Sequence, residues 1–143
     1  MTKNFRKVNV TLQAPEIAIQ TSKNATGILD SLELGESFPF IPKRIFTIRP
    51  NSHAERRGNH AHRKCKQFLT VVNGSCRLEI TYKESHKVYL LEAGKFGVFI
   101  EAFTWVSLSN FSDNCCILVL ASEHYDPADY IYNLDSIKTG VLD

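Results

Sequence analysis

Residues 57–67 of the chain read RGNHAHRKCKQ, and this stretch decides how the rest of the sequence is interpreted. Successive side chains of an extended strand point to opposite faces, so His60 and His62 are predicted to project from the same side of one strand. Two imidazoles on one face form a site for either metal binding or acid–base chemistry.

The spacing of this pair resembles the first metal-binding motif of the cupin barrels, in which an acidic ligand and a glycine stand where this chain has Gln67 and Gly74. Gln67 offers a neutral amide where a divalent cation prefers a carboxylate. The second cupin motif would add a histidine after Gly94, and residues 95–106 contain none. We therefore expect the pair to act as acid–base groups in a pocket without a metal ion or any other cofactor.

Length and composition are typical of one globular domain. The chain has 143 residues, of which 43% are hydrophobic and 22% are charged, so we expect a single domain over residues 1–143. A net charge of +2 argues against binding to nucleic acid. No apolar run approaches the about 18 residues of a membrane span, and the N-terminus does not resemble a signal peptide, so a cytoplasmic protein without membrane contact is expected.

Cysteine usage supports the same location. The four cysteines show no CxxC spacing, which predicts buried, reduced thiols.

Short apolar runs separated by turn residues predict β-strands, with no helical period between them. Asn73 and Gly74 predict a two-residue hairpin, whereas residues 21–27 are expected to form a loop. This pattern indicates an all-β sandwich or barrel. The expected strands cover residues 5–12, 16–20, 43–49, 67–72, 75–82, 87–91, 96–101, 104–111 and 115–121, besides the strand of the His pair.

Two segments need special geometry. His62 and Gln67 are five residues apart and would face opposite ways in a flat strand, so a bend or bulge is expected near residues 63–65. Asp126 and Pro127 predict the start of a short C-terminal helix, with a capping carboxylate followed by proline at the first helical position.

The N-terminal third is poorly anchored, and we expect its strands to pair late or with another subunit. The C-terminal helix is expected to pack Ile131 and Leu134 over the barrel or over a partner.

Several polar and aromatic residues are candidates for substrate binding. Arg44 and Arg57 carry the forked guanidinium that binds a diphosphate, although each could instead pair with surface carboxylates. Gln67 is expected to orient a histidine or a substrate hydroxyl, because a buried amide without a partner is costly. Trp105 either fills the core or stacks on a sugar ring or a base.

Two sequence elements together resemble one enzyme family. They are RGxHAHxxxxQ and VLASxxYDxxDYI, and the similarity continues without gaps through most of the region between them and beyond. The chain is similar to the dTDP-sugar 3,4-ketoisomerases of the WxcM-like cupin group. The matching segments are residues 43–46, 57–64, 67–69, 73–76, 118–122 and 125–131, within residues 43–133.

This resemblance implies a homodimeric, cupin-type jelly-roll enzyme with a short C-terminal helix. Its substrate would be dTDP-4-keto-6-deoxy-D-glucose, and it would move the ketone from C4 to C3. The product would serve the biosynthesis of 3-amino-3,6-dideoxyhexoses for surface glycans such as the O-antigen of lipopolysaccharide. The paired histidines of the family correspond to His60 and His62, and its pocket arginine corresponds to Arg57.

The chain departs from the family pattern at three places. Thr47 stands where the family commonly has tyrosine, Val106 where it has arginine or histidine, and Thr26-Gly27 where it has Arg-Gly. These positions would help to set the configuration at C4 of the product, and Thr47 is carried forward as a candidate substrate contact.

The implied chemistry suits the two histidines. Isomerisation removes the proton from C3, passes through an enediol and returns a proton to C4. A neutral imidazole with an ordinary pKa of about 6.5 can accept the first proton. We assign His62 as the base and His60 as a proton relay or oxyanion support, with the two roles exchangeable.

Three other functions remain open from the sequence. A sugar-nucleotide 3,5-epimerase would also use a histidine base, usually with a tyrosine acid, and would exchange hydrogen at C3 and C5. A metal-dependent cupin such as a dioxygenase would lose activity to a chelator and regain it with Fe²⁺. A non-catalytic cupin would bind a dTDP-sugar without turnover.

Overall fold

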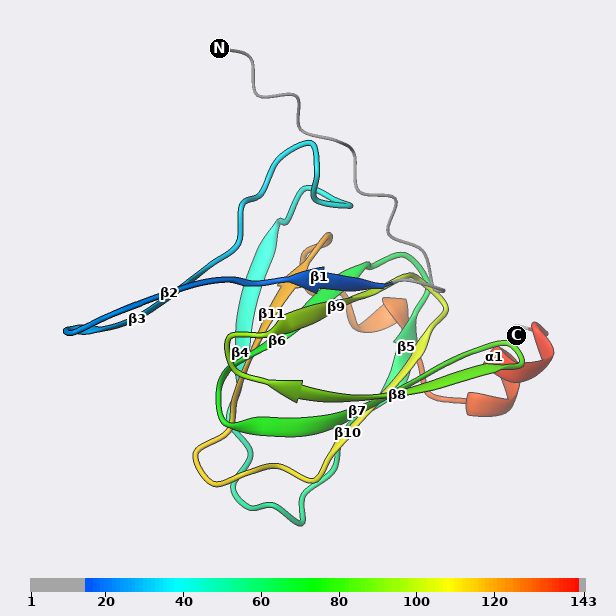
Figure 1. The fold of residues 1–143 in the computed structure, drawn as a ribbon. Helices are drawn as coiled ribbons and strands as arrows, with labels where there is room; N and C mark the ends of the chain where they lie inside the picture. Colours follow the sequence, from blue (N-terminus) through cyan, green and yellow to red (C-terminus); the bar gives the residue numbers. More distant parts are fainter. Residues whose placement is uncertain (1–14, 142–143) are drawn as a thin grey trace.

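The computed structural model of the protein describes residues 15–141, so the strand expected at residues 5–12 lies outside the described residues. Two five-stranded sheets face each other, and all the pairings within them are antiparallel (Figure 1). In spatial order, the first sheet contains β1 (Glu16–Ala18), β9 (Phe96–Ile100), β6 (Gln67–Asn73), β11 (Cys116–Ala121) and β4 (Arg44–Ile48). The second contains β12 (Tyr130–Ile131), β5 (Arg57–His62), β10 (Trp105–Ser109), β7 (Ser75–Tyr82) and β8 (Ser85–Glu92). The all-β, jelly-roll prediction is confirmed.

The main core lies between these two sheets and follows from strict alternation along the strands. In β7, for example, Cys76, Leu78 and Ile80 are 0%, 0% and 3% exposed, as the sequence pattern predicted. Burying an aliphatic side chain of this size contributes roughly 1.5–3 kcal/mol. A slip of one residue would expose the whole row, so the alternation fixes the register.

A second apolar cluster covers the outer face of the first sheet. Phe68 of β6 and Leu120 of β11 point outward there, and Phe38 of the preceding loop packs over them. The Phe38 and Phe68 rings meet edge to face, with centroids 5.4 Å apart. Strand β6 is therefore buried on both faces from Gln67 to Val71.

The hairpin predicted at Asn73-Gly74 is wrong. β6 and β7 belong to different sheets, and the chain crosses between them at Gly74, which has φ 75°. The turn residues were identified correctly, but packing decides which strands pair. β6 pairs with β9 and β11, whereas β7 pairs with β8 and β10.

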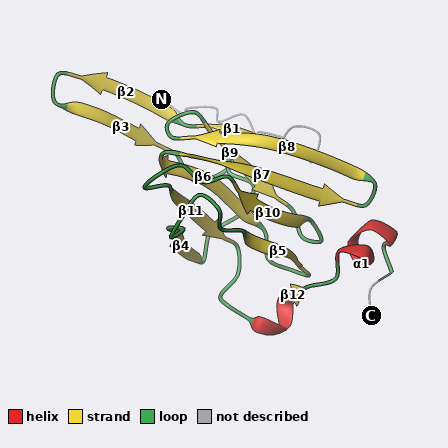
Figure 2. Cartoon of the chain, turned by 90° about the horizontal axis from the view of Figure 1, so that it is seen from below, coloured by secondary structure: helices red, strands yellow, loops and turns green. Residues whose placement is uncertain are grey.

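The loop predicted at residues 21–27 is also wrong. β2 (Gln20–Asn24) and β3 (Gly27–Ser31) form a hairpin that projects from the barrel as an arm (Figures 1 and 2). Asn24 closes its turn, because Oδ1 accepts from the backbone N–H groups of Thr26 and Gly27 at 2.9 and 3.1 Å. β2 is exposed on both faces, so it lacks the alternation that identifies a strand in sequence.

The C-terminal helix starts later than predicted. Asp126 caps a 3₁₀ turn, η1 (Pro127–Asp129), by accepting from the N–H of Ala128 at 3.0 Å. The chain then becomes extended in β12, because Tyr130 pairs with His62 of β5. The helix α1 follows at Leu134–Thr139, and its Ile137 packs with Ile131 against Ala61.

Two smaller predictions concern membrane spans and the cysteines. None of the helices in residues 15–141 is long and apolar enough to cross a membrane. The four cysteines are free thiols, three of them buried, as predicted.

Candidate active site

Strand β5 carries the two histidines on one face, as predicted. The ring centroids of His60 and His62 lie 5.0 Å apart, with the rings nearly perpendicular at 86°. His60 stands opposite Val106 of β10, which belongs to the core between the sheets. Cross-strand neighbours share a face, so both imidazoles point toward the barrel interior.

A local irregularity positions His60. Gly58 and Asn59 have φ angles of 80° and 59°, and the register with β10 shifts at this point. His60 Nδ1 lies 3.0 Å from the carbonyl oxygen of Gly58. A carbonyl only accepts hydrogen bonds, so Nδ1 carries the proton and Nε2 presents a lone pair in the neutral ring.

Asp129 holds His62 in the same tautomer, with the proton on Nδ1. Asp129 Oδ2 lies 3.1 Å from His62 Nδ1, and the two side chains are 12% and 7% exposed. The same carboxylate accepts from the backbone N–H groups of Lys64 and Cys65 at 2.8 and 3.1 Å. The carboxylate is thus fixed, and it leaves the lone pair of His62 on Nε2.

Two buried nitrogen atoms at this site are unsatisfied within residues 15–141. They are Nε2 of His62 and Nε of Arg44. Buried polar atoms normally have hydrogen-bond partners, so these two mark where a polar ligand fits.

Burial keeps both imidazoles neutral. Desolvation lowers the pKa of His60 below 6.5, against the opposing hydrogen bond to Gly58. Desolvation also lowers the pKa of His62, and His60 and Arg44 add to the effect, while Asp129 opposes it. At neutral pH both rings are therefore ready to accept a proton.

Tyr130 lies against both histidines. Its ring centroid is 4.4 Å from that of His62 and 4.8 Å from that of His60. Burial raises the pKa of Tyr130, and the positive charge of Arg44 opposes this shift.

Arg44 and Gln67 are also brought toward the interior. Arg44 extends over the ring of Phe46, with Cζ 5.0 Å from the centroid. Gln67 is 7% exposed and shares a face of β6 with Leu69, a residue of the core between the sheets. The predicted bend exists at residues 63–64. It takes the chain from the second sheet to the first, so His62 and Gln67 both face inward.

Two predicted substrate contacts, Thr47 and Trp105, lie away from the His pair. Arg57 is exposed at the start of β5, the strand that carries the pair. Thr47 is exposed on the face of β4 opposite Arg44 and Phe46. The structure thus corrects the expectation that Thr47 lines the pocket of the His pair, because one residue of offset along a strand reverses the face.

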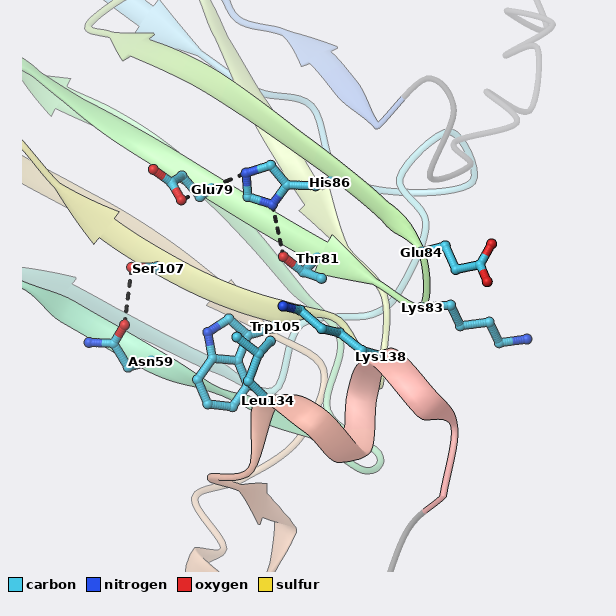
Figure 3. Close-up of a pocket in the computed structure, with 10 residues that line it drawn as sticks. All are labelled: Asn59, Glu79, Thr81, Lys83, Glu84, His86, Trp105, Ser107, Leu134 and Lys138. Atoms are coloured by element: carbon cyan, nitrogen blue, oxygen red, sulfur yellow. Dashed lines mark hydrogen bonds and ion pairs between the residues drawn. The ribbon is translucent and has the colours of Figure 1, made fainter.

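Trp105 also lies outside the pocket of the His pair. Val106 takes the interior position on β10, so Trp105 projects from the outer face and packs against the Ile131 cluster. There it lines a cleft of about 550 Å³ together with Leu134 of α1 and His86 of β8 (Figure 3). Stacking of Trp105 on a ligand held by the His pair is therefore excluded within one chain.

Sequence reasoning missed Asp129 and Tyr130 as site residues. Both residues fall in the segment for which only a short helix was predicted. The signal that could have found both is their place in the DYI end of the element VLASxxYDxxDYI. Pairing of β12 with β5 brings them to the histidines.

One group of side chains has the composition of a metal site. Ligand atoms of His62, Cys65 and Asp129 lie within 4.8 Å of one another. Asp129 already accepts two backbone N–H groups, and Cys65 Sγ lies 3.4 Å from the carbonyl oxygen of Lys66. A cation here would compete with these hydrogen bonds, so the arrangement favours orientation of His62 over metal coordination.

Comparison with known proteins identifies the family. Residues 12–141 match the family described as FdtA: WxcM-like, C-terminal. The chain belongs to the FdtA family. A relative from Aneurinibacillus thermoaerophilus, TDP-4-oxo-6-deoxy-alpha-D-glucose-3,4-oxoisomerase, is 34% identical over 115 residues, which cover 80% of this chain and 83% of the relative.

Solved structures agree with this assignment. A mutant of the 3,4-ketoisomerase QdtA from Thermoanaerobacterium thermosaccharolyticum, in complex with TDP-4-keto-6-deoxyglucose, superposes with a TM-score of 0.80. It is 30% identical, and the match covers 87% of this chain and 91% of QdtA. The RmlC epimerase of Mycobacterium tuberculosis gives a TM-score of 0.73 at 15% identity, covering 90% of this chain and 72% of the epimerase. The second likeness shows the fold alone.

Proposed function

We propose that this FdtA-family protein converts dTDP-4-keto-6-deoxy-D-glucose to a dTDP-3-keto-6-deoxyhexose. One observation carries the proposal: His62 Nε2 is buried and unsatisfied among the described atoms, while Nδ1 is fixed by Asp129. This is the geometry of a general base that awaits a substrate proton. The 3,4-ketoisomerases among the relatives support the choice of reaction.

His62 would carry hydrogen between two adjacent carbons. Nε2 removes the proton from C3, and the electrons of the C–H bond form the enediol double bond as O4 gains electron density. The imidazolium exchanges its proton with solvent through the His60 relay and then protonates C4. Reformation of the carbonyl at C3 completes the isomerisation. General acid–base help of this kind accelerates a reaction by about 10²- to 10⁴-fold.

His60 is proposed as a proton relay beside this base. Its Nδ1–H is donated to Gly58, so in the neutral ring Nε2 accepts a hydrogen bond and cannot stabilise an oxyanion. Of the two roles expected from the sequence, relay is therefore the one that the tautomer supports.

Three side chains are proposed to bind the substrate. Arg44 has an unsatisfied buried Nε, and exposed Arg57 begins the strand of the two histidines. Their guanidinium groups suit the diphosphate and oxygen atoms of the sugar. Gln67 would hydrogen-bond a sugar hydroxyl from the opposite sheet.

We further propose that the enzyme is a homodimer whose N-terminal arm, β2–β3, packs on the second subunit. In the arm, Ile28 is 65% exposed and Leu29 is 61% exposed. Apolar side chains of this size are stabilised when a partner surface covers them. The free, mostly buried thiols support a reducing, cytoplasmic location. The product would enter the synthesis of amino-dideoxy sugars for surface glycans.

The test is to incubate the protein with dTDP-4-keto-6-deoxy-D-glucose in D₂O and to follow the sugar by NMR. We expect a 3-keto product with deuterium at C4, formed equally with and without EDTA, and no product with His62→Asn. Exchange at C5 would instead identify an epimerase, and loss of activity with EDTA would indicate a metal-dependent enzyme. Binding without any product would overturn catalysis altogether.

A further inference from the structure

The two imidazoles leave one requirement of the proposed reaction unmet. His60 donates Nδ1–H to Gly58, and His62 donates Nδ1–H to Asp129. Both neutral rings therefore offer only an acceptor at Nε2. Moving a ketone from C4 to C3 also requires a proton donor at O4 and a proton acceptor at O3, and neither ring starts as a donor.

Tyr130 has the geometry of that donor. It extends from β12 on the face that it shares with His62, and its ring contacts both imidazoles. Its phenol O–H can donate a hydrogen bond to a substrate oxygen. The positive charge of Arg44 favours the ionised form of the same phenol. Arg44 itself stays protonated in proteins, so it can hydrogen-bond to an oxyanion but cannot supply the proton.

We propose that Tyr130 is a catalytic residue that shuttles a proton between O4 and O3 of the sugar. The inference rests on the proposed ketoisomerase function and deepens it. Two shuttles would then divide the work, with His62 transferring hydrogen between carbons and Tyr130 transferring hydrogen between oxygens.

The steps balance without any further reactant. His62 Nε2 takes the C3 proton, the C3–H electrons form the C3–C4 double bond, and the carbonyl π electrons move to O4, which takes the proton of Tyr130. The tyrosinate then removes the proton from the O3 hydroxyl, and the C3–O3 double bond forms. The electrons of the C3–C4 bond take the proton from the His62 imidazolium at C4. Both side chains return to their starting states.

Arg44 assists Tyr130 in this cycle. The positive charge of Arg44 opposes the rise in the pKa of Tyr130 and so stabilises the tyrosinate that forms midway. Burial has the opposite effect on Tyr130, so the phenol remains protonated before the reaction begins. The pairing thus allows a proton to leave transiently from a group that is neutral at rest.

The first experiment compares Tyr130→Phe with Tyr89→Phe. Tyr89 is a matched control because it is also partly buried but packs on Phe96 of the neighbouring strand, away from the histidines. We expect Tyr130→Phe to lower kcat about 10²- to 10³-fold with TDP affinity and melting temperature unchanged. Tyr89→Phe should retain wild-type kcat.

Wild-type turnover within about twofold in Tyr130→Phe would overturn the role of Tyr130 while leaving the proposed function intact. An inactive wild-type protein would instead overturn the proposed function itself.

A second experiment applies if Tyr130→Phe folds poorly. Difluorotyrosine at position 130 retains the size of the ring and the hydroxyl but lowers the phenol pKa. If the protonated phenol is required, the alkaline limb of kcat against pH moves to lower pH by the same amount. An unmoved alkaline limb, in a variant that melts as the wild type does, would overturn the proposal.

Discussion

His62 Nδ1 and Asp129 Oδ2 lie 3.1 Å apart although the two residues are separated by 67 positions in the chain. The carboxylate is fixed by two backbone N–H groups from the bend after β5, those of Lys64 and Cys65. One bend therefore connects His62, the proposed base, to the residue that orients it. Removing the acceptor would leave the imidazole in place but free to adopt the wrong tautomer.

Replacing Asp129 with Asn is expected to reduce kcat by about 10²- to 10⁴-fold with little change in KM. The Asn amide donates to Nδ1, which places the imidazole proton on Nε2 and removes the base. Steady-state kinetics measure the effect. The matched control is Asp126→Asn, which alters the cap of η1 in the same segment and should retain its kcat. Equal losses in the two variants would show that only local folding had changed.

The pH dependence follows from burial of the His pair. Because burial lowers the pKa of His60 and of His62 below 6.5, protonation inactivates the free enzyme only below that pH. We expect kcat/KM to be level near pH 7 and to fall on an acidic limb centred below 6.5. A limb centred at or above 6.5 would contradict the assignment of either imidazole as the base.

Gly58→Ala tests the irregularity that positions His60. A Cβ there would lie 2.8 Å from the carbonyl oxygen of Val106, in a residue with φ 80°. We expect a loss of about 2–5 kcal/mol in the free energy of unfolding, from the left-handed conformation together with the clash. Gly140→Ala is the control, since Gly140 has φ 72° but nothing within 4 Å. It should cost only about 1–2 kcal/mol in urea unfolding. Similar costs would show that the contact with Val106 is unimportant.

The arm is tested by substituting its exposed apolar residues. Ile28→Asp combined with Leu29→Asp should convert the proposed dimer to a monomer, because two charges would be buried in the interface. Light scattering after size-exclusion chromatography measures the mass. Val88→Asp on β8 removes a side chain that is 48% exposed and should leave the dimer intact. The reverse result would place the interface on β8, and a monomeric wild type would end the proposal.

The sequence predicted those features that depend on neighbours along the chain. Alternation identified most strands, and the spacing of His60 and His62 placed both rings on one face because the period of a strand is two. The same reasoning foresaw the bend before Gln67. It failed for β2, which is polar on both faces and so carries no alternation.

Features that depend on distant partners were not predictable in this way. Asn73-Gly74 has the composition of a hairpin, yet β6 pairs with β9 and β11 whereas β7 pairs with β8 and β10, strands that come later in the chain. Asp129 acquires its role only through the pairing of β12 with β5. Trp105 was assigned to the pocket by residue type and Thr47 by its place in the family pattern, whereas the alternation of their own strands turns them outward.

The pairing of β12 with β5 also sets an order of events during protein synthesis. A ribosome adding 5–20 residues per second needs roughly 3–13 s to advance from His62 to Asp129, which lies 67 positions later. Throughout that interval the imidazole of His62 lacks the carboxylate that orients it. The proposed base is therefore completed only near the end of synthesis, and a chain released before β12 would lack it even with both histidines in place.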